Sequence, residues 1–335
     1  MKKALAVYAE AEEQTHVELS YGDAINEATK EEMERDKNVI IIAEDIAVSA
    51  SSGIFGAVDE KRVRSTPISE NSFAGMAIGA AMTGLRPIVN LNIANFIHLA
   101  SDQIINQASK LHFMTGGQMK LPVVFRALML HNGANAAQHS DRPYSMFMNT
   151  PGLKILVPST PADMKGLLKS AIRDDDPVLI FEDVNLYADT GLVSTDPDYL
   201  IPIGKADIKK EGDDITVVSI SGCLRPSLAA AEELEEKNGI SVEVIDLRTL
   251  VPLDKDTILE SVKKTGRLII VDLAHRTNGA AAEIAATIAE EAFDILRRPI
   301  QRVTTPDINI PFSPVLEKLL YPNKEDVMAA IEKIL

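Results

Sequence analysis

The sequence predicts an α/β protein of two domains, each built on a parallel sheet. Short runs dominated by Val and Ile, such as those at 39–43 and 88–91, are typical of strands buried on both faces of a sheet. Amphipathic helices alternate with these runs, and that alternation calls for a parallel sheet. The 335 residues suffice for two domains of ordinary size, each able to bury its own core.

The first predicted domain covers residues 1–190. A helix over 21–36 has apolar side chains on one face and, on the opposite face, Glu27, Lys30, Glu31 and Glu34. Continuous apolar runs place strands at 39–43, 88–91, 121–126, 154–157 and 177–182. Further helices are expected at 72–83, 101–113 and 161–173.

The amino-acid composition changes after residue 188. Residues 188–214 are rich in Asp, Gly, Pro and Thr, which indicates a linker with at most one short strand, and we place the linker proper at 191–212. The second domain, 213–335, is expected to contain strands at 215–220, 242–246, 268–272 and near 300–303. Its helices are expected at 227–236, 256–264, 279–295 and from residue 324 onward.

The composition excludes several classes of function. A formal net charge of −15, with no basic cluster, argues against a nucleic-acid partner. No stretch is long and apolar enough to span a membrane, and the start MKKALAVYAEAEEQ suits neither a signal peptide nor a mitochondrial transit peptide. The single cysteine, Cys223, fits a reducing compartment. We therefore expect a cytoplasmic protein of a bacterium or archaeon.

The most informative stretch is 66–87, TPISENSFAGMAIGAAMTGLRP. A short, mostly apolar segment precedes a run of small residues. Gly84 follows that run, at the position where a glycine commonly ends a helix. Small residues such as Gly75 and Gly79 let a helix press its backbone against a neighbour, at the expense of helix propensity. We therefore expect a closely packed helix here.

Glu70 is the lone carboxylate before that helix, and two interpretations are open. Ser69, Glu70 or Asn71 would cap the first-turn amides of the helix, which is the common role of such residues. Alternatively, Glu70 lies at the carboxyl end of a strand, where open α/β sheets bind ligands. The local sequence does not decide between them.

Several signatures of self-sufficient enzymes are missing from the sequence. It contains no P-loop, no GxGxxG after the first strand, no CxxC pair and no HExxH. The Gly-Asp pairs at 22–23 and 212–213 open no loop that resembles a metal-diphosphate site. A nucleotide or metal enzyme complete in this one chain is therefore not expected.

His139 is the candidate proton carrier among the six histidines. Together with His131 it brackets an irregular segment, HNGANAAQHSDRPYS, which follows a predicted strand. Loops held by a rigid sheet often carry function, and both His139 and Asp141 can exchange protons. Such residues are also often only solvated, and Phe96 taken alone predicts a core aromatic.

Beyond these features, the chain resembles the β subunits of thiamine-diphosphate-dependent 2-oxoacid dehydrogenases, of the pyruvate, branched-chain 2-oxoacid and acetoin types. The resemblance runs in unbroken order from about residue 19 to the C-terminus. It is carried by YGDAINEATKEEMERD, IIIAEDI, TPISENSFAG, GLRPI, NF with DQIINQASK, GGQ, QHS, PGLKILVPSTPADMKGLLKSAIRDDDPV and VIDLRTLVPLD. It implies a transketolase-like pyrimidine-binding domain followed by a transketolase C-terminal-like domain.

The resemblance implies roles for residues around thiamine diphosphate. Glu70 matches the glutamate that hydrogen-bonds the pyrimidine N1′ and favours the imino tautomer, which removes the C2 proton of the thiazolium; the carbanion chemistry is the cofactor's. Phe96 matches the aromatic packed against the pyrimidine ring, and Glu44 a carboxylate near the cofactor. His139 matches a histidine at the substrate end of the site.

The resemblance also implies metals and partners. An α subunit carries the diphosphate motif and holds most of the Mg²⁺ site, so the active enzyme is an α2β2 heterotetramer and this chain alone is inactive. By family analogy the C-terminal domain supplies dimer contacts and docking to a lipoyl acyltransferase core. Backbone oxygens fall where some members hold potassium at Val123, Ala171, Asp174 and Asp176.

Two stretches near the cofactor depart from the family pattern. Asn92 and His98 stand at cofactor-proximal positions that usually carry other side chains, and we count Asn92 among the cofactor-binding candidates. The loop between Asp45 and Thr66 is also shorter than in the family.

A third departure concerns the substrate side. After His139 and Ser140 the family usually continues with glutamine, whereas Asp141 and Arg142 follow here. A carboxylate and a guanidinium at the substrate entrance would change which substrates are accepted. Alternatively, Asp141 and Arg142 pair with each other on the surface and contribute little.

The implied reaction is decarboxylation of a 2-oxo acid, or cleavage of an acyloin such as acetoin, with transfer of the acyl unit to lipoamide. Three alternatives stay open: an acyloin-forming or acyloin-cleaving enzyme without a lipoyl partner, a split transketolase subunit, and a non-catalytic assembly subunit. A split transketolase would need basic residues at the entrance, for which Arg142 is the candidate. A free-standing enzyme would need a diphosphate site that the sequence does not show.

Overall fold

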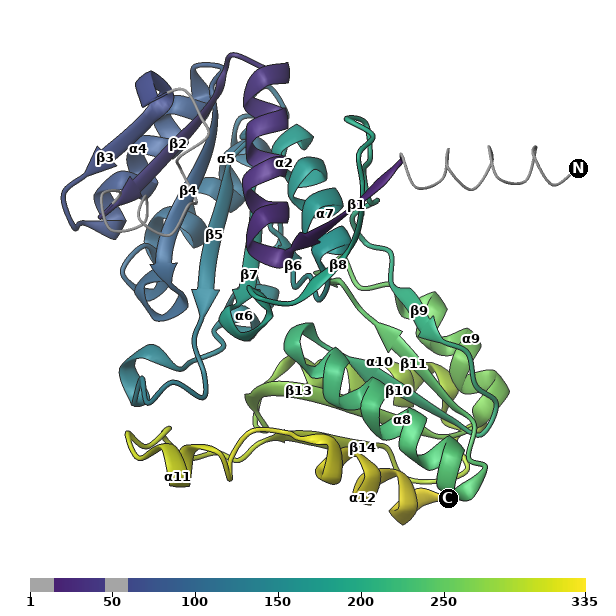
Figure 1. Ribbon diagram of the computed structural model, residues 1–335. Helices are drawn as coiled ribbons and strands as arrows, with labels where there is room; N and C mark the ends of the chain where they lie inside the picture. The colour runs from purple at the N-terminus through teal and green to yellow at the C-terminus, as the bar shows by residue number, and fades with distance from the viewer. Residues whose placement is uncertain (1–14, 46–59) are drawn as a thin grey trace, which may run out of the picture.

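The computed structural model describes residues 15–45 and 60–335, which form the two predicted α/β domains (Figure 1). The first domain is organised on a seven-stranded sheet with the order β12-β6-β7-β5-β4-β2-β3. Its strands are β2 (Val39–Glu44), β3 (Val63–Thr66), β4 (Arg86–Ile93), β5 (Val124–Met129), β6 (Lys154–Leu156), β7 (Val178–Asp183) and β12 (Thr249–Val251). All pairings are parallel except that of β12 with β6.

The second domain has a five-stranded sheet with the order β14-β13-β10-β11-β9. Its strands are β9 (Asp207–Lys210), β10 (Ile215–Ser219), β11 (Val242–Asp246), β13 (Leu268–His275) and β14 (Gln301–Thr305). Only β9 runs antiparallel to its neighbour. A separate antiparallel pair joins β1 (His16–Ser20) to β8 (Thr190–Ser194).

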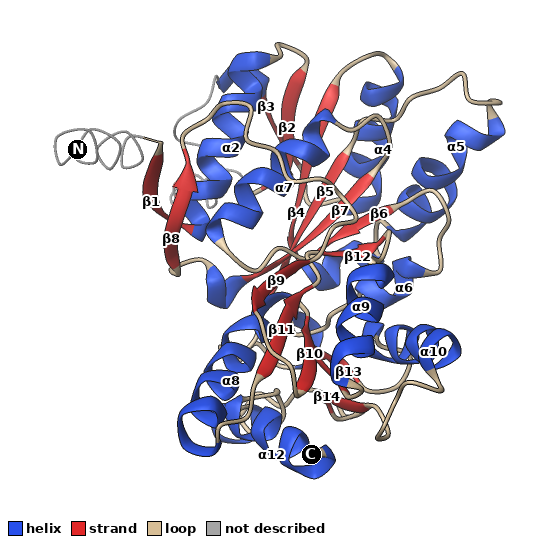
Figure 2. Ribbon diagram, turned by 90° about the vertical axis from the view of Figure 1, so that its right-hand side faces the viewer, coloured by secondary structure: helices blue, strands red, loops and turns tan. Residues whose placement is uncertain are grey.

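Helices cover both faces of each sheet (Figure 2). In the first domain α2 (Tyr21–Arg35) and α7 (Pro161–Arg173) lie side by side on one face, and α4 (Glu70–Met82) and α5 (Ser109–Met114) cover the other. In the second domain α8 (Leu224–Asn238) and α12 (Lys324–Ile334) lie opposite α9 (Lys255–Thr265) and α10 (Ala280–Ala292). No helix in the described part of the chain is long and apolar enough to cross a membrane.

Every predicted helix and strand exists, with ends that differ by a few residues, and the helix at 161–173 has its predicted bounds. Two predictions were wrong in detail. The segment 188–214 contains two strands, β8 and β9, because each pairs with a partner that is distant in sequence. The helix expected at 101–113 contains a π-helical turn, η3 (Gln103–Ala108), before α5.

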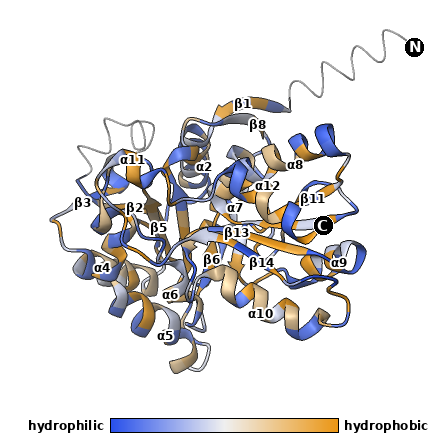
Figure 3. Cartoon of the chain, turned by 90° about the horizontal axis from the view of Figure 1, so that it is seen from below, coloured by the Kyte–Doolittle hydropathy of each residue, from blue (hydrophilic) through white to orange (hydrophobic). Residues whose placement is uncertain are grey.

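The two domains share one continuous apolar core. Strands of the first sheet send side chains such as Ile42 and Phe125 into the same buried cluster as Ile258 and Ile284 of α9 and α10. In Figure 3 β6 and β13 carry hydrophobic colours, as expected for strands covered on both faces. Because β12 comes from the second domain but extends the first sheet, the domains are also joined by strand pairing.

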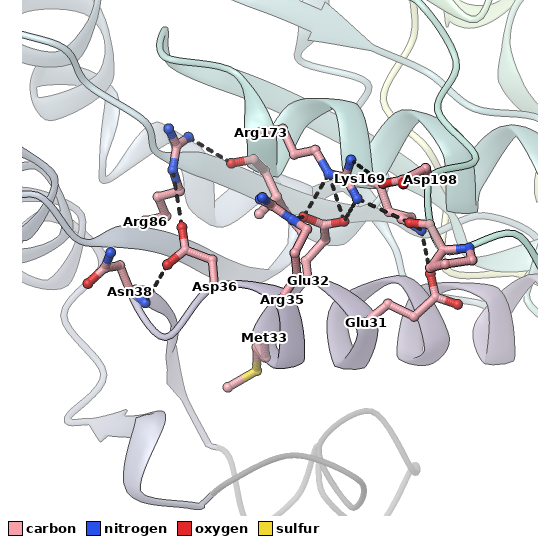
Figure 4. A network of polar contacts seen from close by, with 12 residues as sticks. Glu31, Glu32, Met33, Arg35, Asp36, Asn38, Arg86, Lys169, Arg173 and Asp198 are labelled. Carbon is pink, nitrogen blue, oxygen red and sulfur yellow. Dashed lines mark hydrogen bonds and ion pairs between the residues drawn. The ribbon is translucent and has the colours of Figure 1, made fainter.

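A network of charged side chains connects α2 to α7 (Figure 4). The buried carboxylate of Glu32 accepts hydrogen bonds from Arg173 at 2.7 to 3.0 Å and from Arg35 at 2.7 Å. The buried ammonium groups of Lys165 and Lys169 contact Glu31. The charged face predicted for this helix is therefore not wholly exposed, because α7 packs along the side that carries Glu31.

We expect Glu32→Ala to destabilise the chain by about 2–4 kcal/mol, because it leaves the guanidinium of Arg173 at the helix interface without its main partner. Urea denaturation of the wild type and the variant measures this difference. Glu34→Ala removes an exposed carboxylate from the same helix and should change stability by less than about 0.5 kcal/mol. Equal effects of the two substitutions would contradict a structural role for the network.

Candidate functional site

The predicted site residues lie where parallel strands of the first sheet end. Glu44 is the last residue of β2, and Glu70 is the first residue of α4, which begins a few residues after the neighbouring strand β3. Both side chains are buried, with 1% and 5% of their surface exposed. The carboxyl ends of adjacent parallel strands are the usual ligand-binding edge of an open α/β sheet.

The capping interpretation of this segment is not supported by the contacts. Ser69 occupies the N-cap position of α4, but its side chain bonds no helix amide and instead donates to the hydroxyl of Ser72 at 2.8 Å. Glu70 therefore begins a helix as a buried acid rather than as an exposed cap. The helix ends as expected, with Gly84 in the left-handed region at φ +96°.

Glu44 and Glu70 influence each other electrostatically. Burial, together with the charges of Glu70 and Asp45, raises the pKa of Glu44 to about 7, although a hydrogen bond from the backbone of Ser69 acts in the opposite direction. One oxygen of Glu44, Oε2, is buried without a hydrogen-bond partner among the described residues. A buried acceptor of this kind calls for a partner that the described chain does not supply.

The end of β4 brings an aromatic ring to the same edge. Asn92 adopts a positive φ of 50°, its backbone N–H donates to the side chain of Asn90 at 3.0 Å, and the ladder with β5 shifts register there. This bulge turns the chain into the short helix η2 (Ala94–His98), which presents the half-buried ring of Phe96. Asn90 was not singled out in the sequence analysis. The available signal was its position two residues before Asn92, because Asn adopts a positive φ more readily than most residues.

His139 and Asp141 approach this edge from the loop after β5. The imidazole of His139 meets the ring of Phe96 edge to face, with centroids 5.6 Å apart. Asn95 donates to Asp141 at 2.7 Å and accepts from the backbone N–H of Asp141 at 3.1 Å, a reciprocal pair that fixes the loop. His98 lies 3.9 Å from the same carboxylate. Sequence reasoning had not identified Asn95 as a partner of Asp141.

Arg142 does not lie at the substrate entrance and does not pair with Asp141, so both sequence-based interpretations of this guanidinium were wrong. It is 6% exposed and donates to the backbone oxygens of Leu130 and Ser140 at 2.8 and 2.6 Å. Its guanidinium lies over the ring of Tyr321 from the second domain. Loop closure and aromatic stacking turn it inward.

Two of the four residues proposed for potassium, Asp174 and Asp176, already contact cationic side chains. Lys154 lies 2.7 Å from the carboxylate of Asp174 and 3.1 Å from that of Asp176, and Arg86 donates to the backbone oxygen of Asp174 at 2.8 Å. The backbone oxygens of Val123 and Ala171 accept from the N–H groups of Val178 and Asp174. Positive charge is therefore present at this place without a metal ion.

The helices beside the site pack closely at one glycine and expose several apolar side chains. The helix from η3 to α5 packs on α4 at Gly75, where a Cβ atom would lie 2.9 Å from the side chain of Gln103, as the small-residue pattern predicted. Gly79 instead faces open space. Large apolar side chains of this region remain exposed, namely Ile68, Met76, Leu99, Phe113 and Met114.

No group of three or more His, Cys, Asp or Glu residues is placed to hold a metal ion within residues 15–45 and 60–335. The loop that the sequence comparison found to be short falls largely on 46–59, outside the described residues. What the described chain brings together is two buried acids, an aromatic ring and a histidine along one strand edge.

Both halves of the chain match family models. The pyrimidine-binding domain of transketolase matches residues 17–190, and the transketolase C-terminal domain matches residues 204–327. A solved structure titled as a split-gene transketolase, an inactive β4 tetramer, superimposes with a TM-score of 0.79 at 24% identity, covering 95% of this chain and 98% of that one. At that identity the likeness establishes the fold.

Curated relatives match over nearly their whole lengths. The 2-oxoisovalerate dehydrogenase subunit beta of Bacillus subtilis is 45% identical over 94% of this chain and 98% of its own. The acetoin:2,6-dichlorophenolindophenol oxidoreductase subunit beta of the same organism is 43% identical over 95% and 97%. The pyruvate dehydrogenase E1 component subunit beta of Rickettsia bellii is 43% identical over 95% and 99%. The chain therefore belongs to the family of E1 β subunits of thiamine-diphosphate-dependent 2-oxoacid and acetoin dehydrogenases.

Proposed function

We propose that this chain is the β half of an α2β2 enzyme that decarboxylates a 2-oxo acid, or cleaves an acyloin such as acetoin, and passes the acyl unit to lipoamide. The observation that carries the proposal is the pair of buried acids, Glu44 and Glu70, beside Phe96 and His139 on an open strand edge. The names of the relatives support the same classes of substrate.

The residues present fit thiamine diphosphate. The unpartnered Oε2 of Glu44 and the neighbouring acid Glu70 suit the nitrogens of an aminopyrimidine, and the half-buried ring of Phe96 suits its flat face. When bound, the cofactor supplies a carbon nucleophile for the substrate carbonyl. Glu70 would hold a proton at the pyrimidine ring nitrogen, and Glu44, with a pKa near neutrality, would act as its partly protonated neighbour.

On the substrate side we assign His139 the transfer of a proton to or from the reacting carbonyl group, and Asp141 the positioning of the loop that carries it. The reciprocal contacts with Asn95 support this division of roles. The Asp141 oxygen that accepts from Asn95 also lies 3.9 Å from His98, so this loop brings a carboxylate to the proposed entrance. The inward position of Arg142 removes the one feature that favoured a split transketolase.

An α subunit would complete the site. The exposed apolar side chains around α4, Ile68 and Leu99 among them, form a surface suited to a partner chain. We assign the diphosphate and most of the Mg²⁺ site to that partner, and docking to a lipoyl acyltransferase core to the C-terminal domain. We also propose a potassium ion at the backbone oxygens named above, although Lys154 and Arg86 already supply positive charge beside Asp174. The buried Cys223 accords with a cytoplasmic location.

We expect Glu70→Gln to lower the activity of the α2β2 enzyme by about 10²–10⁴-fold, because the amide cannot exchange the proton held at the pyrimidine. The measurement is substrate-dependent turnover of the complex reconstituted from both chains. Glu34→Gln, which neutralises an exposed carboxylate, should leave turnover unchanged.

Calorimetry with thiamine diphosphate and Mg²⁺ completes that experiment. Binding should require the α chain, since this chain carries only the pyrimidine side of the site. Tight binding by this chain alone would refute the shared site. Full turnover of the Glu70→Gln complex would instead favour an assembly subunit without a catalytic role.

Asp141→Ala should raise KM for the 2-oxo acid about tenfold while leaving the affinity for thiamine diphosphate unchanged, because it removes the contacts with Asn95 that hold the His139 loop. Steady-state kinetics and cofactor titration of the assembled complex separate the two effects. Asp294→Ala, at an exposed position of the second domain, is the control. A parallel loss of cofactor affinity would place Asp141 on the cofactor side instead.

The pKa of Glu44 predicts a pH dependence for the chain without cofactor. An acid whose pKa rises from 4.5 to about 7 on folding keeps its proton in the native state, so the stability it contributes is lost as pH rises from about 4.5 through 7. Glu44→Gln should therefore stabilise the chain by roughly 1–3 kcal/mol at pH 8, and by much less at pH 5. Urea denaturation at the two pH values measures this, and a gain independent of pH would argue against a buried, ionising Glu44.

A further inference from the structure

A cavity lies between the two domains, away from the strand edge that carries Glu70. Its volume is about 360 Å³, less than half that of the surface groove on α10, which is about 780 Å³. The first domain contributes His131, after β5, and Asp183, at the end of β7. The second domain contributes Arg225 of α8, Leu273 of β13 and the segment with Tyr321.

The cavity occupies a favoured place in the second sheet. From β10 the chain passes through α8 to β11 on one side, and then through α9 to β13 on the other side of β10. The carboxyl ends of β10 and β13 therefore form a topological switch point, where open α/β sheets bind ligands. Gly222, just after β10, and Leu273, near the end of β13, both line the cavity.

Two buried polar atoms in its wall have no partner among the described residues. Asp183 is fully buried, and its Oδ2 accepts no hydrogen bond. His131 is 8% exposed, and its Nδ1 lies 3.3 Å from Oδ1 of Asp183 without the alignment of a hydrogen bond. Burial and the nearby Arg142 lower the pKa of His131 to about 3, so the imidazole is neutral and forms no ion pair with Asp183. Unpaired groups at this depth call for a partner.

The remaining wall offers further donors and an apolar surface. The buried hydroxyl of Tyr321 lacks an aligned hydrogen bond, although the hydroxyl of Ser140 lies beside it. At the mouth stand two cations, Arg225 bonded to Asp189 and Lys324 bonded to Glu233. Leu186 and Leu273 supply apolar contact. The cavity thus combines an anionic acceptor inside with cationic groups at its entrance.

We propose that this cavity binds a small carboxylic acid that carries a hydroxyl or an ammonium group next to its carboxylate. The hydroxyl or ammonium group donates to Oδ2 of Asp183, and the carboxylate faces Arg225 and Lys324. A short carbon chain fits against Leu273. The donor group of the ligand thus matches the carboxylate inside the cavity, and the carboxylate of the ligand matches the cations at the mouth.

Calorimetric titration of the full chain with four probes tests the site. L-Alanine has both groups with an ammonium, L-lactate has both with a hydroxyl, propionate lacks the donor, and isopropylamine lacks the carboxylate. We expect at least one of the first two to bind saturably and at least tenfold more tightly than propionate and isopropylamine. Tighter binding of L-alanine than of L-lactate identifies the ammonium class, and the reverse identifies the hydroxyl class.

Three variants decide whether the binding occurs in this cavity. Asp183→Asn keeps the shape of the side chain and should weaken the preferred probe at least tenfold. Arg225→Gln changes an exposed side chain at the mouth, so it should fold even if the buried variant does not, and it should weaken the carboxylate probes severalfold. Arg298→Gln, an exposed arginine outside the cavity, is the control. Failure of all four probes to bind, or binding unchanged in Asp183→Asn and Arg225→Gln, would overturn the proposal in favour of a cavity filled by water.

Discussion

Two carboxyl groups of like charge, those of Glu44 and Glu70, lie buried at one edge of the first sheet, and the surrounding structure keeps them there. Burial alone raises the pKa of Glu44, and the neighbouring acid raises it further. The parallel register of β2 with β3 and β4 fixes where each strand ends. An arrangement that costs folding free energy is retained at a site when the same groups serve chemistry, and the chemistry that we propose for these two acids is the sharing of a proton.

The second domain makes contacts that hold the loop of this site in place. Tyr144, just after the His139 loop, donates to the buried carboxylate of Asp272 on β13. Ser159 donates to Asp246 at the end of β11 at 2.8 Å. Together with the pairing of β12 to β6, these contacts fix the ends of strands from both sheets against each other. The loop that carries His139 is therefore anchored from two domains, and a change at their junction would alter the proposed active site.

Much of this arrangement could be predicted from the sequence, and what could not depends on contacts between distant segments. The helix that follows Glu70 could be predicted because its small residues mark it directly, whereas the local sequence left open whether Glu70 caps that helix or lies at a strand end. Asn95 was missed because its role depends on Asp141, and Arg142 was misjudged because it contacts Leu130 and Tyr321. No local sequence pattern indicates these contacts. Likewise β12 is only three residues long, too short for its own periodicity to reveal it.

The loop before His139 shows how strain and burial are balanced. Asn132, Ala134 and Ala136 all adopt a positive φ near 55°, a conformation that costs an alanine roughly 1 kcal/mol. The fully buried carboxylate of Glu317, from α11 (Pro314–Glu317), accepts the N–H groups of Asn132 and Ala134 at 2.8 and 2.9 Å. Charge-assisted bonds of this kind offset strain of that size. Because these bonds span the two domains, the loop keeps its shape only while the C-terminal segment stays docked, which ties the position of His139 to the whole chain rather than to its own domain.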